Sequence, residues 1–464
     1  MDGKWVMGVN KMQLGTSITV EITGFGHEGQ GVGRWNETAV FIAGALPGET
    51  VQARVRRCAK RHLEADLIEV TQAHPERQKP PCILTERCGG CSLQHASAAL
   101  QLDLKRDLVQ QSLSRLAKLE VAVEPVWGCK HSLGYRNRAL IPLERAEDGR
   151  LRAGYYRRGS HKIVNLNHCP VLDPRIDGLI EPIKRDLEKT GWPVDVNLSG
   201  KGGLRHLALR VGSATGEILI TLVSSHRQLK GLETLAQRWM ERWPEVVGVG
   251  LNLQPKASNV VMGPETDLIA GRSWLLEVFD GIELRIAADT FFQVNTPQAE
   301  RLVEPLRAFF ATGQSATVID AYSGIGTYSL PLARSGLKVL GLEVHPASVS
   351  QATANAERNG IETAFFEQAD VAMVLAERLK MTGSLLVDPP RKGLSAEALA
   401  AILDGKPERL AYISCNPSTL ARDLQQLCGE DGGYQLERVQ PVDFFPQTSH
   451  VETLALLTQS GSGA

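Results

Sequence analysis

The pattern of apolar and polar positions divides the chain into stretches of different texture. Residues 13–73 alternate short β-forming runs with glycine turns, and the turn GALPGE precedes a run over residues 50–57. This pattern predicts about five short strands, which suits a small OB-like β-barrel of a kind whose face and loops often bind oligonucleotides. Residues 95–120 instead carry apolar side chains at helical spacing without Gly or Pro, so they predict a helix.

The remaining three quarters of the chain predict two larger units. Residues 130–290 mix strands and turns, with helices near 175–190 and 228–242. From about residue 291, five strand–helix units follow one another and lead to two final strands, which predicts a doubly wound parallel sheet ending in an antiparallel pair. We therefore expect a multidomain protein with an OB-like barrel (1–73), an α+β central domain (74–290) and a C-terminal α/β Rossmann-like domain (291–464).

Composition and charge narrow the class of protein. No apolar run approaches the roughly 20 residues that cross a bilayer, and the start MDGKWVMGVNKM lacks a secretory signal pattern. We therefore expect a cytoplasmic protein whose eight cysteines are reduced thiols, metal ligands or catalytic groups. Net charge is −1, but residues 130–168 hold nine Lys and Arg against three acids, whereas residues 313–404 hold seven against ten. A basic front half suits a bound polyanion, although any one block alone fits ordinary solvated surface.

The first strand–helix turn of the C-terminal region, DAYSGIGT, predicts a nucleotide-like cofactor. Gly324 and Gly326 permit a tight turn, and Glu343, 23 residues after Asp320, ends the next strand, where an acid can bind a ribose diol. The third glycine of the dinucleotide fingerprint is replaced by Ser329. Together with a further acid, Asp370, this favours S-adenosylmethionine over NAD.

Two later strands end in candidate reacting groups. The run over 384–387 ends at Asp388, and the two prolines that follow fix the exit of the chain so that the carboxylate projects beyond the sheet. The next run ends at Cys415, and the last strand begins near Glu452. If the first two strands are neighbours, Asp388 and Cys415 share one cleft. A surface carboxylate and a buried, inert thiol are the alternatives.

A methyl donor, a thiol and a carboxylate base suit methylation of a pyrimidine at C5. That carbon is a poor nucleophile until a thiolate adds to C6, and a base must later remove the C5 proton. We expect Cys415 to be the nucleophile, Glu452 the base, and Asp388 to bind the cofactor or polarise the ring. The target base must leave its stack to reach such a cleft.

The segment ADTFFQVN leads into the C-terminal domain and offers groups that suit a base or a cofactor. Phe291 and Phe292 provide rings for stacking, and Gln293 and Asn295 provide amides for hydrogen bonds. A helix cap with core aromatics is the alternative.

A cluster of cysteines lies outside the C-terminal domain. Cys82, Cys88 and Cys91 form a C-x5-C-x2-C pattern, and Cys169 is the best fourth ligand. Three clustered cysteines and a distant one suit a structural [4Fe-4S] cubane, and the spacing differs from the C-x3-C-x2-C of radical enzymes. Zinc is the rival, although a zinc ribbon usually shows two C-x-x-C pairs. Unpaired buried thiols are the remaining alternative.

These motifs together resemble the RNA uracil-C5 methyltransferase family, in particular its iron–sulfur, TRAM-domain branch that acts on 23S ribosomal RNA. The resemblance rests on the four cysteines and on FFQVN, DAYSGIGTYSLPLA, DPPRKG, SCNP and HVET. It implies a [4Fe-4S] cluster, 5-methyluridine as the product, and a helix near residues 95–125 packed on the catalytic domain. It also implies cofactor contacts at a set of six residues: Gln293, Tyr322, Thr327, Glu343, Asp370 and Asp388.

Three other functions compete with this interpretation. The branch that methylates uracil in the T-loop of transfer RNA has a similar catalytic half but lacks the barrel and the cluster. A catalytically inactive RNA-binding iron–sulfur protein is opposed by Cys415 and Glu452, and an amino-group methyltransferase is suggested by Asp-Pro-Pro alone. No protein partner is evident from the sequence.

Overall fold

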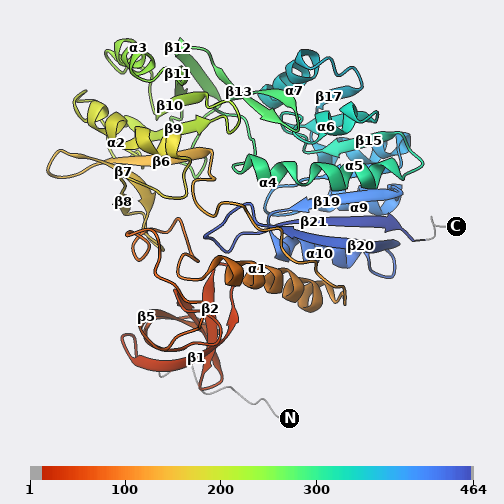
Figure 1. Cartoon of the computed structure of the whole chain (residues 1–464), viewed down its shortest axis with the longest axis horizontal. Coiled ribbons are helices and arrows are strands. Elements are labelled where there is room, and N and C mark those ends of the chain that lie inside the picture. Colours follow the sequence, from red (N-terminus) through yellow and green to blue (C-terminus); the bar gives the residue numbers. More distant parts are fainter. Residues whose placement is uncertain (1–12, 461–464) are drawn as a thin grey trace.

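The computed structural model describes residues 13–460, and these form three parts that follow one another along the chain (Figure 1). Residues 1–12, on which the expectation about a secretory signal rests, and residues 461–464 lie outside the described part. Within residues 13–460, no helix combines the length and the apolar character needed to cross a membrane.

The N-terminal part is a closed five-stranded barrel, as the alternating pattern predicts. In its first strand, buried and exposed side chains alternate, so Ile18, Val20 and Ile22 point into the barrel core. The strand order is β1-β2-β3-β5-β4. The strands are β1 (Ser17–Phe25), β2 (Gln30–Trp35), β3 (Thr38–Ala43), β4 (Thr50–Cys58) and β5 (His62–Gln72).

A long helix follows the cysteine segment, the stretch of residues 74–97. Helix α1 (Ala98–Ser112) begins where the Ser97 hydroxyl accepts a hydrogen bond from the amide of Leu100 at 3.1 Å. It continues as a π-helical turn, η2 (Leu113–Ala117), and ends at Lys118, whose φ is +60°. The predicted helix over 95–120 is therefore shorter at both ends, because its cap lies at Ser97 and its last turn widens.

The central part is built on a mixed seven-stranded sheet, ordered β12-β11-β10-β9-β6-β7-β8, with an adjoining hairpin β13-β14. Helices α2 (Pro174–Glu188) and α3 (Leu232–Arg242) lie where helices are predicted, and their apolar faces join the same core as the sheet. The strands are β6 (Arg138–Arg145), β7 (Leu151–Tyr156), β8 (Ile163–Asn165), β9 (Leu204–Val211), β10 (Ile218–Ser224), β11 (Val246–Leu253), β12 (Glu265–Gly271), β13 (Trp274–Phe279) and β14 (Ile282–Ala287).

The C-terminal part is the predicted doubly wound sheet, ordered β17-β16-β15-β18-β19-β21-β20. Five strands run parallel, and the last two pair antiparallel beside them. The strands are β15 (Thr317–Ala321), β16 (Lys338–Glu343), β17 (Ala364–Gln368), β18 (Ser384–Val387), β19 (Arg409–Ser414), β20 (Tyr434–Val442) and β21 (Glu452–Gln459). The helices are α4 (Thr296–Glu300), α5 (Val303–Ala311), α6 (Ser329–Arg334), α7 (Pro346–Arg358), α8 (Val371–Arg378) with the 3₁₀ turn η3 (Leu379–Met381), α9 (Ala396–Gly405) and α10 (Pro417–Leu427).

Helix α1 joins the barrel end of the molecule to the C-terminal sheet, and Figure 1 shows it lying beside α10 and β20. Lys105 of α1 is completely buried and pairs with Asp443, just after β20, at 2.5 Å. Its ammonium group also donates to the carbonyl of Phe445 at 3.0 Å. A buried charge needs such partners, so this pair ties the helix to the segment between the last two strands.

Candidate functional site

Three of the predicted reacting groups lie at the same edge of the C-terminal sheet. Strands β18 and β19 are parallel neighbours, so Asp388 and Cys415 both follow the carboxyl ends of adjacent strands. Strand β21 runs antiparallel to β19, with Thr453 opposite Ser414. Glu452, at the amino end of β21, therefore lies beside Cys415. The cleft shared by Asp388 and Cys415 is expected only if their two strands are neighbours, and β18 and β19 are neighbours.

The helix after Cys415 begins with a side-chain cap. Asn416 accepts a hydrogen bond from the amide of Ser418 at 3.1 Å, and Pro417 occupies the first turn, where a missing N–H costs nothing. The Asn416 amide group also donates to the carbonyl of Arg391 at 3.1 Å. The Cys415 turn is thus attached to the turn that follows Asp388.

The thiol of Cys415 is half-buried and its pKa is raised to about 11. Burial is the largest cause, and the carboxylates of Glu452 and Asp388 raise the pKa further, whereas Arg391 lowers it. At neutral pH, Cys415 is consequently a thiol that needs a proton acceptor before it can act as a nucleophile.

The two carboxyl groups beside Cys415 also hold protons unusually well. Burial raises the pKa of Glu452 to about 8, with Asp388 adding to the shift and Arg391 opposing it. Burial, with a contribution from Asp320, raises the pKa of Asp388 to about 7. A thiol flanked by carboxyls that titrate near neutrality is an arrangement suited to proton transfer.

Sequence reasoning missed two residues that belong to this environment. The Tyr328 side chain is buried, and its hydroxyl has no hydrogen-bond partner among residues 13–460. Burial, with Asp388, Glu452 and Asp320, raises its pKa well above the usual value. Arg391 is the cation that acts on both Cys415 and Glu452. Both residues belong to motifs quoted above. An aromatic residue near a helix start, such as Tyr328, ordinarily indicates a core position. The direction of an arginine side chain in a turn, such as Arg391, does not follow from any periodicity.

The glycine turn after β15 is held against the end of β16. The Glu343 carboxylate accepts from the amides of Gly324 at 3.1 Å and His345 at 2.7 Å. A Cβ added at Gly324, whose φ is +56°, would meet no atom within 4 Å, so the space over this turn is open. Tyr322 has a φ of +71°, a conformation that non-glycine residues rarely adopt.

Acidic groups surround the turn. Asp320 is buried, accepts from the Ser329 hydroxyl at 2.5 Å, and has a pKa raised to about 7, chiefly by burial. Asp370 caps helix α8 through the amide of Ala372 at 3.0 Å. Burial, with contributions from Asp370 and Asp423, raises the pKa of Tyr322 to about 12.

The other two predicted cofactor residues are buried. Thr327 lies in the turn before α6. Gln293 enters from the segment before α4, where its carbonyl accepts from the Asn137 amide group at 3.0 Å. Of the two phenylalanines in that segment, Phe292 packs edge-on against Phe279 in the core, whereas Phe291 is 58% exposed. The core alternative therefore holds for Phe292, and Phe291 is free to meet a ligand.

The four cysteines predicted as cluster ligands are placed near one another by the central sheet. The amide of Gly89 donates to the carbonyl of Tyr156 on β7 at 2.9 Å, and the amide of Cys169 donates to the Asp177 carboxylate at 2.6 Å. Burial raises the pKa of Cys91 to about 11, and Cys88 and Cys82 add to that shift. Burial likewise raises the pKa of Cys169 to about 12, with Cys91 and Cys88 contributing.

Among residues 13–460, no group of three or more His, Cys, Asp or Glu side chains is placed so that it could hold a metal ion. The predicted iron–sulfur character of the central part is therefore not shown by this structure.

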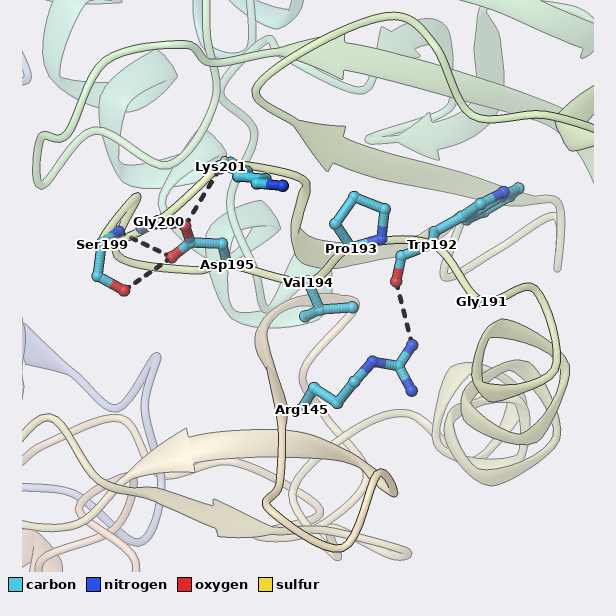
Figure 2. Close-up of a pocket in the computed structure, with 10 residues that line it drawn as sticks. Arg145, Gly191, Trp192, Pro193, Val194, Asp195, Ser199, Gly200 and Lys201 are labelled. Carbon is cyan, nitrogen blue, oxygen red and sulfur yellow. Dashed lines mark hydrogen bonds between the residues drawn. The ribbon is translucent and has the colours of Figure 1, made fainter.

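A shallow hollow of about 560 Å³ lies elsewhere, on the central part of the molecule (Figure 2). Its floor is the loop after Trp192, where the Asp195 carboxylate accepts from the amides of Ser199 and Gly200. None of the predicted site residues lines it, and the Asp195 charge is already satisfied by the loop itself.

Comparisons with known proteins show the family to which the chain belongs. A profile of the tRNA (Uracil-5-)-methyltransferase family matches residues 97–460, and a TRAM domain profile matches residues 11–68. An uncharacterized RNA methyltransferase of Parasynechococcus marenigrum is 46% identical over 450 residues, which are 97% of each chain. Another, from Halalkalibacterium halodurans, is 38% identical over 457 residues, covering 97% of this chain and 98% of that one.

A solved structure is similar over nearly its full length. The crystal structure of Pyrococcus abyssi tRNA (uracil-54, C5)-methyltransferase in complex with S-adenosyl-L-homocysteine superimposes with a TM-score of 0.75 at 27% identity, covering 95% of this chain and 99% of that one. The resemblance predicted from the motifs is thereby confirmed. The chain belongs to the RNA uracil-5 methyltransferase family, in a form that carries an N-terminal TRAM domain.

Proposed function

We propose that this protein uses S-adenosylmethionine to methylate C5 of a uridine in 23S ribosomal RNA, forming 5-methyluridine. The observation that carries the proposal is the convergence of Cys415, Asp388 and Glu452 at one sheet edge. An enzyme that alkylates nitrogen or oxygen has no use for a thiol between two carboxyl groups, whereas C5 methylation needs a nucleophile and a base.

Each protein group then has a defined task. Cys415 passes its proton to the neighbouring Asp388 carboxylate as its Sγ adds to C6 of the uracil. Electron density moves to C5, which takes the methyl group and leaves S-adenosylhomocysteine. The Glu452 carboxylate removes the C5 proton, the bond between Sγ and C6 breaks, and the thiolate leaves. Asp388, half-buried beside both, also binds the cofactor or polarises the ring.

The residues around the glycine turn fit S-adenosylmethionine, which supplies an electrophilic methyl group when bound. Asp320, Glu343, Asp370 and Asp388 make this edge of the sheet rich in acceptors, which suits a sulfonium cation with an amino group and ribose hydroxyls. A pyrophosphate would be repelled by the same carboxylates. Glu343 and Asp370 would face the cofactor with Tyr322 and Thr327 of the glycine turn, and Gln293 would contribute from the segment before α4.

The RNA substrate has two candidates. The barrel supports RNA binding, because OB-like barrels commonly bind oligonucleotides and because its β4 carries Arg54, Arg56 and Arg57. Transfer RNA is the second candidate, since the similar Pyrococcus abyssi enzyme is a tRNA (uracil-54, C5)-methyltransferase and the match covers 95% of this chain. That match must include most of the barrel and cysteine segment, so their presence does not distinguish the two substrates.

A covalent trap tests the proposal directly. We would incubate the protein and S-adenosylmethionine with 23S RNA or transfer RNA transcribed with 5-fluorouridine, which has no C5 proton to lose. We expect an adduct with 23S RNA that survives a denaturing gel, and sequencing the attached RNA locates the target. An adduct with transfer RNA alone would show that transfer RNA, and not 23S RNA, is the substrate. The absence of an adduct with either RNA would contradict C5 methylation.

We further propose that Cys82, Cys88, Cys91 and Cys169 hold a structural [4Fe-4S] cluster. The support is that burial raises the pKa of Cys88, Cys91 and Cys169 and that neighbouring cysteines add to each shift. Thiolates that act on one another in this way are unstable without a cation. The four ligands of a cubane also stand farther apart than those of a single ion, whose bonds to sulfur measure about 2.3 Å for zinc.

Anaerobically purified protein is expected to be brown and to contain about four irons per chain, as a cubane held by four thiolates requires. Metal analysis with an absorption spectrum measures this. Cys169→Ala should lose iron, whereas Cys428→Ala, which changes a half-buried thiol directly after α10, should retain it. Stoichiometric zinc without iron would contradict the cluster.

A further inference from the structure

The segment that leads to Glu452 is held by residues from the other end of the chain. This base loop, residues 443–449, forms most of the connection from β20 to β21 and is almost entirely buried. Within it, Gln447 has a φ of +70°, which is unfavourable for a non-glycine residue. Such a conformation persists only where surrounding contacts impose it.

Gln101 of helix α1 provides the main contact. Its side-chain oxygen accepts from the backbone amide of Gln447 at 2.8 Å, and its amide group donates to the side-chain oxygen of Gln447 at 3.1 Å. Gln101 is 2% exposed, and its amide group also donates to the carbonyls of Leu93 at 3.2 Å and Ala96 at 2.9 Å. One buried side chain therefore joins the base loop to the end of the cysteine segment.

The cysteine segment and the barrel complete the contact. The amides of Ser92 and Leu93, directly after Cys91, donate to the Gln447 carbonyl at 3.1 and 2.9 Å. The amide of Ser449 donates to the Ser92 hydroxyl at 3.0 Å, and its own hydroxyl donates to the carbonyl of His27 in the barrel at 2.9 Å. The barrel approaches closely here, since a Cβ added at Gly29 would lie 2.6 Å from the Ser92 hydroxyl.

Glu452 depends on this junction for its direction. Strand β20 holds it on one side, where it lies opposite Val442. Along the chain, only the four residues 448–451 separate Glu452 from Gln447. If the backbone of Gln447 relaxed to an ordinary conformation, the start of β21 would therefore move. A displacement of about 1 Å can cost a catalytic step about 100-fold.

We propose that Gln101 is a positioning residue for proton removal, because its paired bonds to Gln447 fix the loop that sets the direction of Glu452. The inference rests on the proposed function, in which Glu452 is the base. Since the base acts after the thiol has added to C6, loss of Gln101 should slow release of the product and spare formation of the adduct.

Gln101→Met keeps the volume of the side chain and removes its hydrogen bonds. The matched control is Gln110→Met on the same helix, because Gln110 makes an equivalent pair of bonds to the backbone of Val121 and Val123, away from the base loop. Trapping with 5-fluorouridine RNA measures adduct formation. Covalent complex accumulating on ordinary RNA, with the rate of product release, measures the later step.

For Gln101→Met we expect a normal rate of trapping, release slowed about 10- to 100-fold, and complex accumulating on ordinary RNA. Gln110→Met should trap and release RNA at normal rates and should accumulate no complex, even where it lowers Tm by a comparable amount. Ser92→Ala, which removes only the acceptor for the Ser449 amide, repeats the test without emptying the core and should show the same pattern more weakly.

The outcomes separate the inference from the function on which it rests. Equal slowing of trapping and release, or normal release in both Gln101→Met and Ser92→Ala, would overturn the positioning role. If Glu452→Gln, assayed in parallel, releases product slowly while both of these variants release it normally, the base stands and only the positioning role fails. Normal turnover of Glu452→Gln would overturn both.

Discussion

Replacing Cys415 with alanine is expected to abolish methylation, lowering turnover by a factor of roughly 10⁴ or more, and to eliminate the adduct trapped by 5-fluorouridine RNA. Without the thiol, nothing adds to C6, and C5 remains a poor nucleophile. Binding of RNA and S-adenosylmethionine should persist, since the barrel and the glycine turn are untouched. Gel-resolved adducts and transfer of a labelled methyl group measure both effects.

Cys428→Ala is the matched control for this experiment. The two cysteines flank the same helix, α10, Cys415 before its first turn and Cys428 at its end. Burial raises the pKa of each to about 11, so their intrinsic acidity does not distinguish them. Only Cys415 lies beside Glu452, Asp388 and Arg391, and Cys428→Ala should therefore be fully active. Methylation that survives Cys415→Ala would point to a nitrogen atom as the acceptor.

Glu452→Gln is expected to form the covalent adduct at a normal rate and to release it about 10²- to 10⁴-fold more slowly, so that complex accumulates on ordinary RNA. The amide keeps the shape of the side chain but accepts no proton from C5. Single-turnover kinetics that follow adduct and product separately provide the measurement. Glu437→Gln, on the neighbouring strand β20, changes an exposed carboxylate that bonds Thr458 of β21 and should release product normally.

The pH dependence of release provides a second signature of Glu452. Burial raises its pKa to about 8, so the base is largely protonated at pH 7 and becomes ionised as the pH rises. Release by the unmodified protein should accelerate with pH up to about 8 and then level off, and this rise should vanish in Glu452→Gln. A variant with normal turnover and an unchanged pH profile would remove Glu452 from the mechanism.

Much of the fold follows from local patterns in the sequence. The strict alternation of β1 predicts a strand with one face in a core, and the succession of strand and helix after residue 291 predicts a doubly wound sheet, because burial of one face imposes these periods. The reacting groups follow as well. Asp388 and Cys415 end consecutive strands, and in a doubly wound sheet such ends share an edge.

Central strand β9 shows where local patterns fail. All eight of its residues, LRHLALRV, are buried, although three of them, Arg205, His206 and Arg210, are polar. The guanidinium of Arg205 donates to the carbonyls of Gln254 and Lys256, and that of Arg210 to the carbonyls of Ala287 and Thr290. A sequence pattern would place arginines on the surface. Their acceptors come from segments 49 to 80 residues away, so burial becomes tolerable only in the folded chain.

The motifs predict which reactive groups are present, but not how distant segments arrange them in space. Residue type and strand position indicate a thiol, a base and an acidic cofactor turn at Cys415, Glu452 and Glu343. The unpartnered hydroxyl of Tyr328 and the joining of Gln101 to Gln447, 346 residues apart, depend on which elements pack together. Periodicity predicts which face of each element is buried, one element at a time. Hydrogen bonds between distant segments form only after packing has brought their donors and acceptors within reach.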